Sequence, residues 1–181
     1  SPPLIKTTPK ERIKLMSRSI GIDLGTTNSV AAIKKVQVEI LKNAEGDYLT
    51  PSCVTVKKKK LPFSKPEFVV GKDALEWMKQ DPENTVQAVK RLMGRSIRNP
   101  EVIKIIEEKR VTYGINRHSR GTNNKLGIML GGKEFSPEEI SAKILEKIRL
   151  DAEASFGGEV AYAVITVPAY FNDKQKHATR M

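Results

Sequence analysis

At residues 19–29 the chain reads Ser19-Ile20-Gly21-Ile22-Asp23-Leu24-Gly25-Thr26-Thr27-Asn28-Ser29. Apolar residues alternate with glycine and Asp23 from Ile20 to Gly25, which is the period of a β-strand. The small and hydroxyl-bearing residues that follow predict a turn. The apolar run from Val30 to Ile33 then predicts a second strand, so the stretch indicates a strand–turn–strand unit.

Asp23 is the unusual residue of this unit. A carboxylate inside an apolar strand pattern is unfavourable unless it meets a cation. Glycine lets the backbone approach a ligand closely, and successive N–H groups can form an anion-binding concavity. One interpretation is therefore a clamp for a metal-bound nucleotide. The other is a hairpin in which Asp23 caps its own turn.

Length and composition predict a globular domain that does not bind or cross a membrane. The chain has 181 residues, of which 39% are hydrophobic and 29% charged. No apolar run approaches the ~20 residues of a membrane helix. The single cysteine, Cys53, excludes an internal disulfide and fits a cytoplasmic location. It is far in sequence from His118 and His177, which argues against a zinc site.

The net charge of +11 is concentrated in two places. Residues 1–18 carry +4 and the run Lys57-Lys58-Lys59-Lys60 carries another +4, which leaves +3 for the remainder. Residues 1–18 lack the apolar segment of a secretory signal, and we interpret them as a disordered basic tail or extension. Aromatic residues make up 6% and none lies among the four lysines, so the sequence does not predict nucleic-acid binding.

Short strands and helices are predicted between residues 36 and 135. Alternation predicts strands at 36–41, 53–56, 68–71, 111–115 and 126–130. Apolar spacing predicts one helix that ends before Pro82 and another from Thr85 to Met93, with Asn84 as its N-cap. A third helix is predicted from Pro100 to Lys109. Lys90 would lie on the second of these helices.

The strongest helix signal begins at Ser136. This residue can act as the N-cap, Pro137 suits the first helical position, and Glu139 completes a capping box. Apolar residues then recur every four positions from Ile140 to Ala152. The pattern predicts a long amphipathic helix that packs on a sheet and stops at Gly157.

A nearly continuous apolar run from Val160 to Val167 predicts a strand with both faces covered. Pro168 ends this strand, and Asp173 is expected to cap a last helix. Together the elements predict an α/β fold with a mixed sheet. Ligands of such sheets bind beyond the carboxyl ends of strands, so the turn after Asp23 and residues 168–170 are expected to share one mouth.

Five segments of the sequence resemble the DnaK-type chaperones, the heat shock protein 70 family. They are Gly21-Ile22-Asp23-Leu24-Gly25-Thr26-Thr27-Asn28-Ser29, Asn43-Ala44-Glu45-Gly46, Val89-Lys90-Arg91-Leu92-Met93-Gly94-Arg95, Ser136-Pro137-Glu138-Glu139-Ile140-Ser141-Ala142 and Ala163-Val164-Ile165-Thr166-Val167-Pro168-Ala169-Tyr170-Phe171-Asn172-Asp173. The first motif also has relatives in actin-like ATPases and sugar kinases. The five together, in the family's order and spacing, are specific to it.

The resemblance implies an actin-like ATPase fold of the ribonuclease-H type. Residues 19–181 would form the first lobe of the nucleotide-binding domain, with residues 52–135 as an inserted subdomain. ATP, ADP and Mg²⁺ are the implied cofactors, and ATP hydrolysis would drive cycles of binding and release of unfolded polypeptides. A J-domain co-chaperone and a nucleotide-exchange factor are the partners implied for the full-length protein.

The same resemblance implies roles for individual residues. The first phosphate loop, around the β- and γ-phosphates, would consist of Gly25, Thr26, Thr27 and Asn28. Asp23 would orient Mg²⁺ through bound water, which suits an ion that keeps several waters. Lys90 would lie beside the γ-phosphate and the attacking water, where its charge offsets developing negative charge. The alternative for Lys90 is a solvated helix lysine.

Pro168 and Lys176 correspond to a switch in the family. Pro168 matches a proline that responds to the nucleotide state, although it also suits a simple strand terminator. At the position of Lys176 the family usually has an arginine that relays from this proline. Lysine keeps the charge but lacks the planar guanidinium fork.

The matched segments supply only one wall of an ATP site. The family's second phosphate loop, its acidic metal partners and its peptide-binding domain have no counterpart in these residues. The chain alone is therefore expected not to be an active ATPase. Two other classes of function stay open at this point: a small-molecule kinase of the same fold, and a catalytically inactive interaction module.

Overall fold

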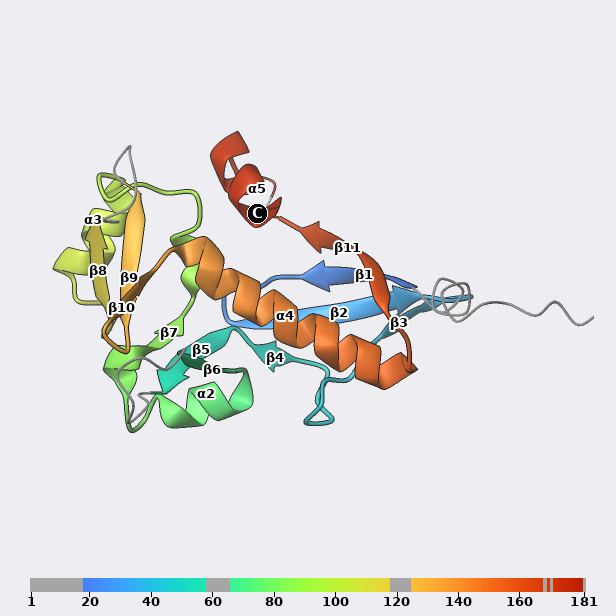
Figure 1. Ribbon diagram of the computed structural model, residues 1–181. Coiled ribbons are helices and arrows are strands. Elements are labelled where there is room, and N and C mark those ends of the chain that lie inside the picture. The colour runs from blue at the N-terminus through green and yellow to red at the C-terminus, as the bar shows by residue number, and fades with distance from the viewer. Residues whose placement is uncertain (1–17, 58–65, 118–124, 168, 170, 181) are drawn as a thin grey trace, which may run out of the picture.

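The computed structural model describes residues 18–57, 66–117, 125–167, 169 and 171–180, which form three sheets around one long helix (Figure 1). Most of the predicted basic tail, the lysines at 58–60 and Pro168 therefore lie outside the described residues. Arg18 and Lys57 are described, and both belong to strands. Among the described residues, no helix is both long and apolar enough to cross a membrane.

The main sheet is built on the predicted strand–turn–strand unit. Its strands are β1 (Arg18–Asp23), β2 (Asn28–Lys34), β3 (Val38–Ile40), β4 (Thr50–Pro51) and β11 (Val160–Thr166). The spatial order is β11-β1-β2-β3, and β4 pairs with the start of β2. Because β1 pairs in parallel with β11 and antiparallel with β2, the predicted mixed sheet is confirmed.

Two smaller antiparallel sheets occupy the middle of the chain. One has the order β6-β5-β7 and consists of β5 (Cys53–Lys57), β6 (Glu67–Val70) and β7 (Thr85–Gln87). The other has the order β10-β9-β8 and consists of β8 (Gly114–Arg117), β9 (Leu126–Leu130) and β10 (Lys133–Phe135). The short helices of this region are α2 (Lys72–Trp77), η1 (Pro82–Asn84), η2 (Val89–Arg91) and α3 (Pro100–Glu107). The proposed boundaries of an inserted subdomain, 52 and 135, stay a prediction.

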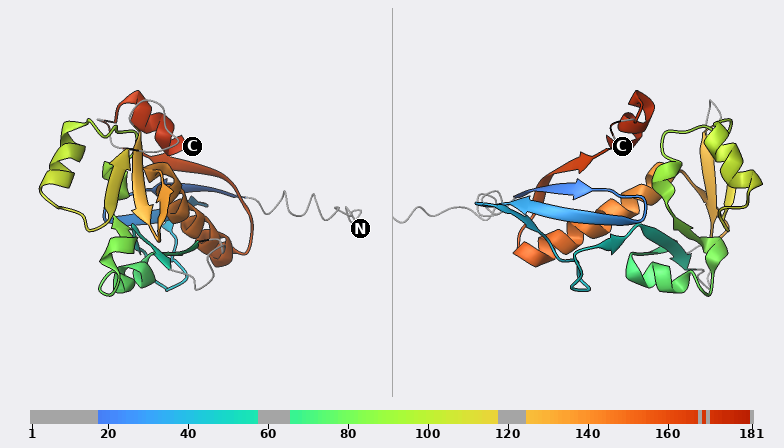
Figure 2. Two further views of the ribbon diagram at one scale, coloured as in Figure 1. Left: turned by 60° about the vertical axis from the view of Figure 1, so that its left-hand side comes forward. Right: turned by 180° about the vertical axis from the view of Figure 1, so that it is seen from behind.

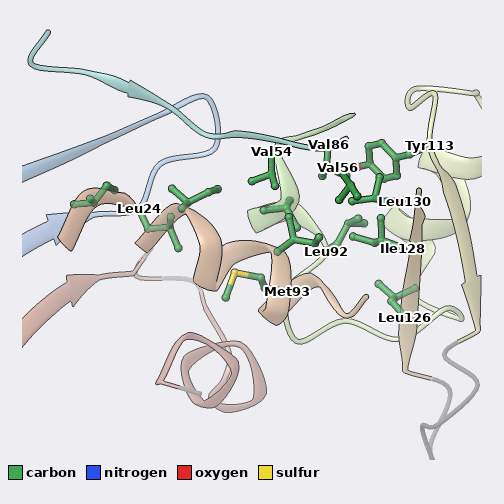
Figure 3. Packing of buried hydrophobic residues seen from close by; sticks show 14 of the residues in the cluster. Leu24, Val54, Val56, Val86, Leu92, Met93, Tyr113, Leu126, Ile128 and Leu130 are labelled. Atoms are coloured by element: carbon green, nitrogen blue, oxygen red, sulfur yellow. The ribbon is translucent and has the colours of Figure 1, made fainter. Parts of the chain in front are cut away.

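The long helix α4 (Pro137–Phe156) begins and ends as the sequence predicts. The Ser136 hydroxyl accepts a hydrogen bond from the Glu139 N–H at 3.1 Å, and the Glu139 carboxylate accepts one from the Ser136 N–H at 2.6 Å. Gly157 ends the helix in the left-handed conformation with φ 66°. The buried stripe of Ile140, Ile144 and Ile148 faces the sheets. Figure 3 shows how side chains from several elements, Val54, Leu92 and Ile128 among them, gather in the resulting core.

The predicted helix from Thr85 to Met93 is wrong. Thr85, Val86 and Gln87 form β7, which pairs with β5, and only Val89–Arg91 is helical, as a single 3₁₀ turn. β-Branched residues favour a strand that can bury them, and here Val86 is fully buried against its neighbours. Ala88 separates the two elements with a left-handed backbone, φ 56°.

The predicted N-cap of that helix, Asn84, has a different role. Its amide donates to the Asp81 carboxylate at 2.7 Å, and its carbonyl oxygen accepts from the Gly131 N–H at 2.6 Å. Asn84 therefore ties η1 to the turn between β9 and β10.

Two predicted strands are shifted or shortened. The one expected at 111–115 is β8, Gly114–Arg117, because its register with β9 pairs Gly114 with Met129. The one expected at 36–41 keeps only β3, Val38–Ile40.

The strand predicted at 160–167 exists as β11, but it is not covered on both faces. Helix α4 covers one face of the main sheet (Figures 1 and 2). On the opposite face Tyr162 is 73% and Val164 is 69% exposed. No element among the described residues covers these two side chains.

The last helix, α5 (Asp173–Arg180), is capped by Asn172 rather than by Asp173. The Asn172 side-chain oxygen accepts from the Gln175 N–H at 3.0 Å, and the Gln175 side-chain oxygen accepts from the Asn172 N–H at 3.2 Å. This reciprocal pair is a capping box one residue earlier than predicted.

A three-residue ion network ties the turn at 43–47 to α4. The Lys147 ammonium lies 2.9 Å from Glu45 Oε1 and 2.9 Å from Asp151 Oδ2. Burial alone would raise the pKa of Glu45, but the hydrogen bond and charge of Lys147 lower it below its ordinary value. Burial alone would lower the pKa of Lys147, but its two carboxylate partners raise it.

These pKa shifts predict how stability depends on pH. Because the pKa of Glu45 is lowered on folding, its ionised carboxylate stabilises the fold at pH values above the ordinary pKa of 4.5. This contribution is lost as the pH falls through the folded-state pKa of Glu45. Glu45→Gln should therefore destabilise the chain by about 1 kcal/mol at pH 7, or roughly 2–4 °C in melting temperature. The difference should shrink below about pH 4, as thermal melts followed by circular dichroism would show.

Glu39→Gln is the matched control, because the Lys35–Glu39 pair is about half exposed. We expect it to change stability by less than about 0.5 kcal/mol at either pH. A Glu45→Gln effect of constant size between pH 3 and pH 7 would contradict the pH argument.

Candidate functional site

The carboxyl ends of β1 and β11 meet at Asp23. The parallel register pairs Asp23 with Thr166, and the Thr166 hydroxyl donates to Asp23 Oδ1 at 2.7 Å. The other carboxylate oxygen has no partner among the described residues, and Asp23 is exposed. Asp23 therefore does not cap its own turn, and it presents a fixed carboxylate at the edge expected to form the mouth.

The turn from Gly25 to Asn28 follows directly and is very tight. A Cβ built on Gly25 would lie 1.9 Å from the Asn28 carbonyl oxygen, so only glycine fits this close approach. Leu24 is buried beneath the turn, whereas Thr27 and Asn28 are exposed. The turn is thus anchored by a buried residue at its start and is exposed to solvent at its end.

Ser52 contacts the same turn from the segment between β4 and β5. Its hydroxyl donates to the Gly25 carbonyl oxygen at 2.9 Å and lies 2.9 Å from the Ser29 hydroxyl. Its backbone N–H donates to the Thr27 carbonyl oxygen at 2.8 Å. Ser29 and Ser52 are both buried.

Lys90 reaches the turn from η2. Its ammonium donates a hydrogen bond to the Leu24 carbonyl oxygen and lies 5.7 Å from the centre of the Phe171 ring. Burial lowers the pKa of Lys90 below its ordinary value, and the negative charge of Asp23 opposes this shift. The structure thus brings together Asp23, the 25–28 turn and Lys90, and Lys90 is a partly buried lysine rather than a solvated one.

The predicted switch is only partly described. Pro168 lies outside the described residues. The ammonium of Lys176, on α5, is 3.9 Å from the Asp173 carboxylate, and its side chain is 45% exposed. The segment that follows η2 lies close to α5 at Gly94. A Cβ built on Gly94 would be 2.7 Å from the Gln175 Cα. The switch roles of Pro168 and Lys176 stay predictions.

The arrangement offers one carboxylate rather than a closed metal cage. In the part of the chain that the structure describes, no three His, Cys, Asp or Glu side chains form a potential metal-binding group. A cavity of about 580 Å³ lies elsewhere, between β3 and the end of α4, and its lining includes Arg18, Tyr48 and Phe156. The exposure of Asp23, Thr27 and Asn28 makes the candidate site an open surface.

Comparison with protein-family models matches residues 19–181 to the Hsp70 protein family. The chain belongs to the Hsp70 family. The match covers all the described residues except Arg18, and the N-terminal region of this family has the actin-like ATPase fold. The predicted family and fold class are therefore confirmed.

Hsp70 proteins bind ATP and Mg²⁺. The carboxylate of Asp23 is exposed and, among the described residues, accepts one hydrogen bond, from Thr166. It fits a Mg²⁺ ion held through water, because a carboxylate that binds the ion's water molecules needs an accessible oxygen and not a cage of ligands. The tight turn, in which Thr27 and Asn28 are exposed, fits a phosphate group.

Sequence reasoning missed three residues that shape this surface: Ser52, Thr166 and Phe171. Thr166 could have been found from the expected pairing of two strand ends, since β1 and β11 were both predicted. The sequence contains no pattern that predicts the role of Ser52. Its hydroxyl binds a residue 27 positions away, and a single sequence does not distinguish a buried serine from an exposed one. Phe171, like Thr166, lies in the family-like segment 163–173, but the resemblance implied no role for either residue.

The close approach at Gly25 predicts a localised defect. Gly25→Ala must push the Asn28 backbone away, which should destabilise the chain by about 1–3 kcal/mol and move the amide signals of residues 25–28 in NMR spectra. Gly21→Ala is the control, because the nearest atom to its Cβ would be 4.0 Å away. Equal stability and unchanged turn signals for both variants would show that the turn tolerates a side chain.

Proposed function

We propose that this chain supplies one wall of the ATP site of an ATP-dependent folding chaperone of the DnaK type. The supporting observation is the convergence of Asp23, the Gly25–Asn28 turn and Lys90 on one exposed surface. These three parts come from β1, the β1–β2 turn and η2, and they carry the charges that a metal-bound triphosphate requires.

Each residue has a distinct part in the proposal. The backbone of Gly25, Thr26, Thr27 and Asn28 would bind the β- and γ-phosphates. Asp23, held by Thr166, would orient Mg²⁺ through water, and the ion would neutralise phosphate charge when bound. Lys90 would leave the Leu24 carbonyl for the γ-phosphate, since a phosphate offers its ammonium a stronger, charge-assisted hydrogen bond.

Hydrolysis and chaperone action belong to the proposal for the full-length protein. An open surface does not exclude water or fix an attacking geometry, so we expect this chain alone to bind nucleotide weakly and not to turn it over. Unfolded client polypeptides would bind to a peptide-binding domain that these residues do not contain. A J-domain co-chaperone, a nucleotide-exchange factor and a cytoplasmic location complete the proposal.

Membership of the Hsp70 family favours this function over a small-molecule kinase of the same fold. The catalytically inactive interaction module differs from the proposal in one measurable respect, since such a module would not need Asp23 and Lys90 to bind Mg²⁺-ATP.

The proposal predicts Mg²⁺-dependent stabilisation by ATP. At a concentration ten times the dissociation constant, ATP should raise the free energy of unfolding by about 1.4 kcal/mol, or roughly 3–5 °C in melting temperature. Asp23→Asn combined with Lys90→Ala should abolish the shift, because both charged groups are lost. Differential scanning fluorimetry with and without Mg²⁺ measures this directly.

Lys104→Ala is the control for lost positive charge, because Lys104 is 61% exposed on α3 and its ion pair is long, at 3.8 Å. It should leave the ATP-dependent shift unchanged. A shift that survives the Asp23→Asn, Lys90→Ala double variant would overturn the proposed site.

A further inference from the structure

The segment between β4 and β5 holds the candidate phosphate loop through one residue. Ser52 makes two hydrogen bonds to carbonyl oxygens of the loop, one from its hydroxyl to Gly25 and one from its N–H to Thr27. The residue is only 3% exposed, so water does not compete for these contacts.

The direction of every proton in this cluster follows from simple chemistry. A carbonyl oxygen only accepts, so the single hydroxyl proton of Ser52 goes to Gly25. The 2.9 Å contact between the two serine hydroxyls must then have Ser29 as donor and Ser52 as acceptor. The hydrogen bonds thus run in one direction, from Ser29 to Ser52 and from Ser52 to Gly25. Each bond in this series polarises and strengthens the next.

The two hydrogen bonds from Ser52 to the loop fix the orientation of two backbone donors. In a planar trans peptide, the C=O of one residue and the N–H of the next point in opposite directions. Because the carbonyls of Gly25 and Thr27 point at Ser52, the N–H groups of Thr26 and Asn28 point away from it. Two alternate N–H groups aimed to one side make the concavity that binds an anionic oxygen.

We propose that Ser52 is a positioning residue of the phosphate site, which aims the Thr26 and Asn28 N–H groups at the phosphates through its hydrogen bonds to Gly25 and Thr27. The inference rests on the proposed function and adds to it a residue outside the loop. Ser52 touches no phosphate itself. Its hydroxyl holds the Gly25 carbonyl, and its N–H holds the Thr27 carbonyl, away from a negatively charged ligand, which both carbonyls would repel.

Another buried serine shows what a purely structural role looks like. Ser141 on α4 is 1% exposed, and its hydroxyl donates to the Met93 sulfur at 3.1 Å. Among the described residues, its hydroxyl makes this one hydrogen bond and does not touch the loop. Ser52→Ala and Ser141→Ala therefore remove the same atom from equally buried sites, and only the first loosens the loop.

The test uses the full chain and inorganic triphosphate as the probe, with NMR titration in the presence and absence of Mg²⁺. Ser52→Ala should weaken triphosphate binding about tenfold, because the Gly25 carbonyl loses its donor and the loop loses its fixed orientation. It should also move the amide signal of Thr26 in the free chain, and that of Asn28 less, because alanine keeps the N–H that binds the Thr27 carbonyl. Ser141→Ala should do neither, even if both variants melt at the same lowered temperature.

Ser29→Ala distinguishes the contribution of the Ser29 hydroxyl from that of the Ser52 hydroxyl. It removes the donor to Ser52 but leaves the bond to Gly25, so we expect a loss of twofold or less in affinity. The double variant Ser29→Ala, Ser52→Ala should bind as Ser52→Ala does, since the two hydroxyls act in series. If Ser52→Ala does not fold, Ser52→Cys replaces it, with a weaker donor in nearly the same space and an intermediate loss.

The outcomes separate this inference from the proposed function. If the parent chain binds triphosphate and Ser52→Ala binds it equally well with unmoved amide signals, Ser52 has no positioning role. If the parent chain binds no triphosphate, the proposed function fails. In that case, a Thr26 signal that moves in Ser52→Ala but not in Ser141→Ala would still support control of the loop by Ser52, and an unmoved Thr26 signal would overturn both.

Discussion

The packing of α4 against all three sheets is the contact on which the described structure depends. A helix of 20 residues is about 30 Å long, and this one touches β2 and β11, β5 and β6, and β9. Its isoleucines recur every four residues, and each contributes on the order of 1.5–3 kcal/mol when it leaves water. Because η2 also packs on α4, the helix fixes the position of Lys90 relative to the loop after β1. The packing of α4 therefore fixes the positions of parts of the candidate site without contributing any of its proposed residues.

The loop itself depends on hydrogen bonds that arrive from three directions. Thr166 on β11 holds Asp23, Ser52 holds the carbonyls of Gly25 and Thr27, and Lys90 holds that of Leu24. None of these partners is close to the loop in sequence. The loop needs such support because an anion-binding turn must keep its N–H groups aligned before the ligand arrives. A glycine that approaches the Asn28 carbonyl this closely leaves the turn few other shapes.

The sequence predicted what is determined locally and failed where distant contacts decide. The capping box at Ser136 and Glu139 involves residues only three positions apart, so the local sequence is sufficient to predict it. The run from Thr85 to Met93 has helical spacing, yet its first three residues form a strand that pairs with β5. This pairing buries Thr85 and Val86 and gives their backbone N–H and C=O groups hydrogen-bond partners. Asp23, the loop and Lys90 were matched to a family motif by residue type, but the strand-and-turn setting of Lys90 was not foreseen. The directed hydrogen bonds through Ser52 join parts of the chain that no periodicity connects.

The uncovered face of β11 has a consequence for how the chain behaves in solution. In the part of the chain that the structure describes, β11 is an edge strand of the main sheet, and its seven residues include no charge and no proline. Edge strands normally carry such residues, because they prevent a second chain from adding to the free row of N–H and C=O groups. With Tyr162 and Val164 exposed beside that row, β11 is the element through which separate copies are expected to aggregate as concentration or temperature rises. The strand expected to promote aggregation is thus the same strand that carries Thr166 to Asp23.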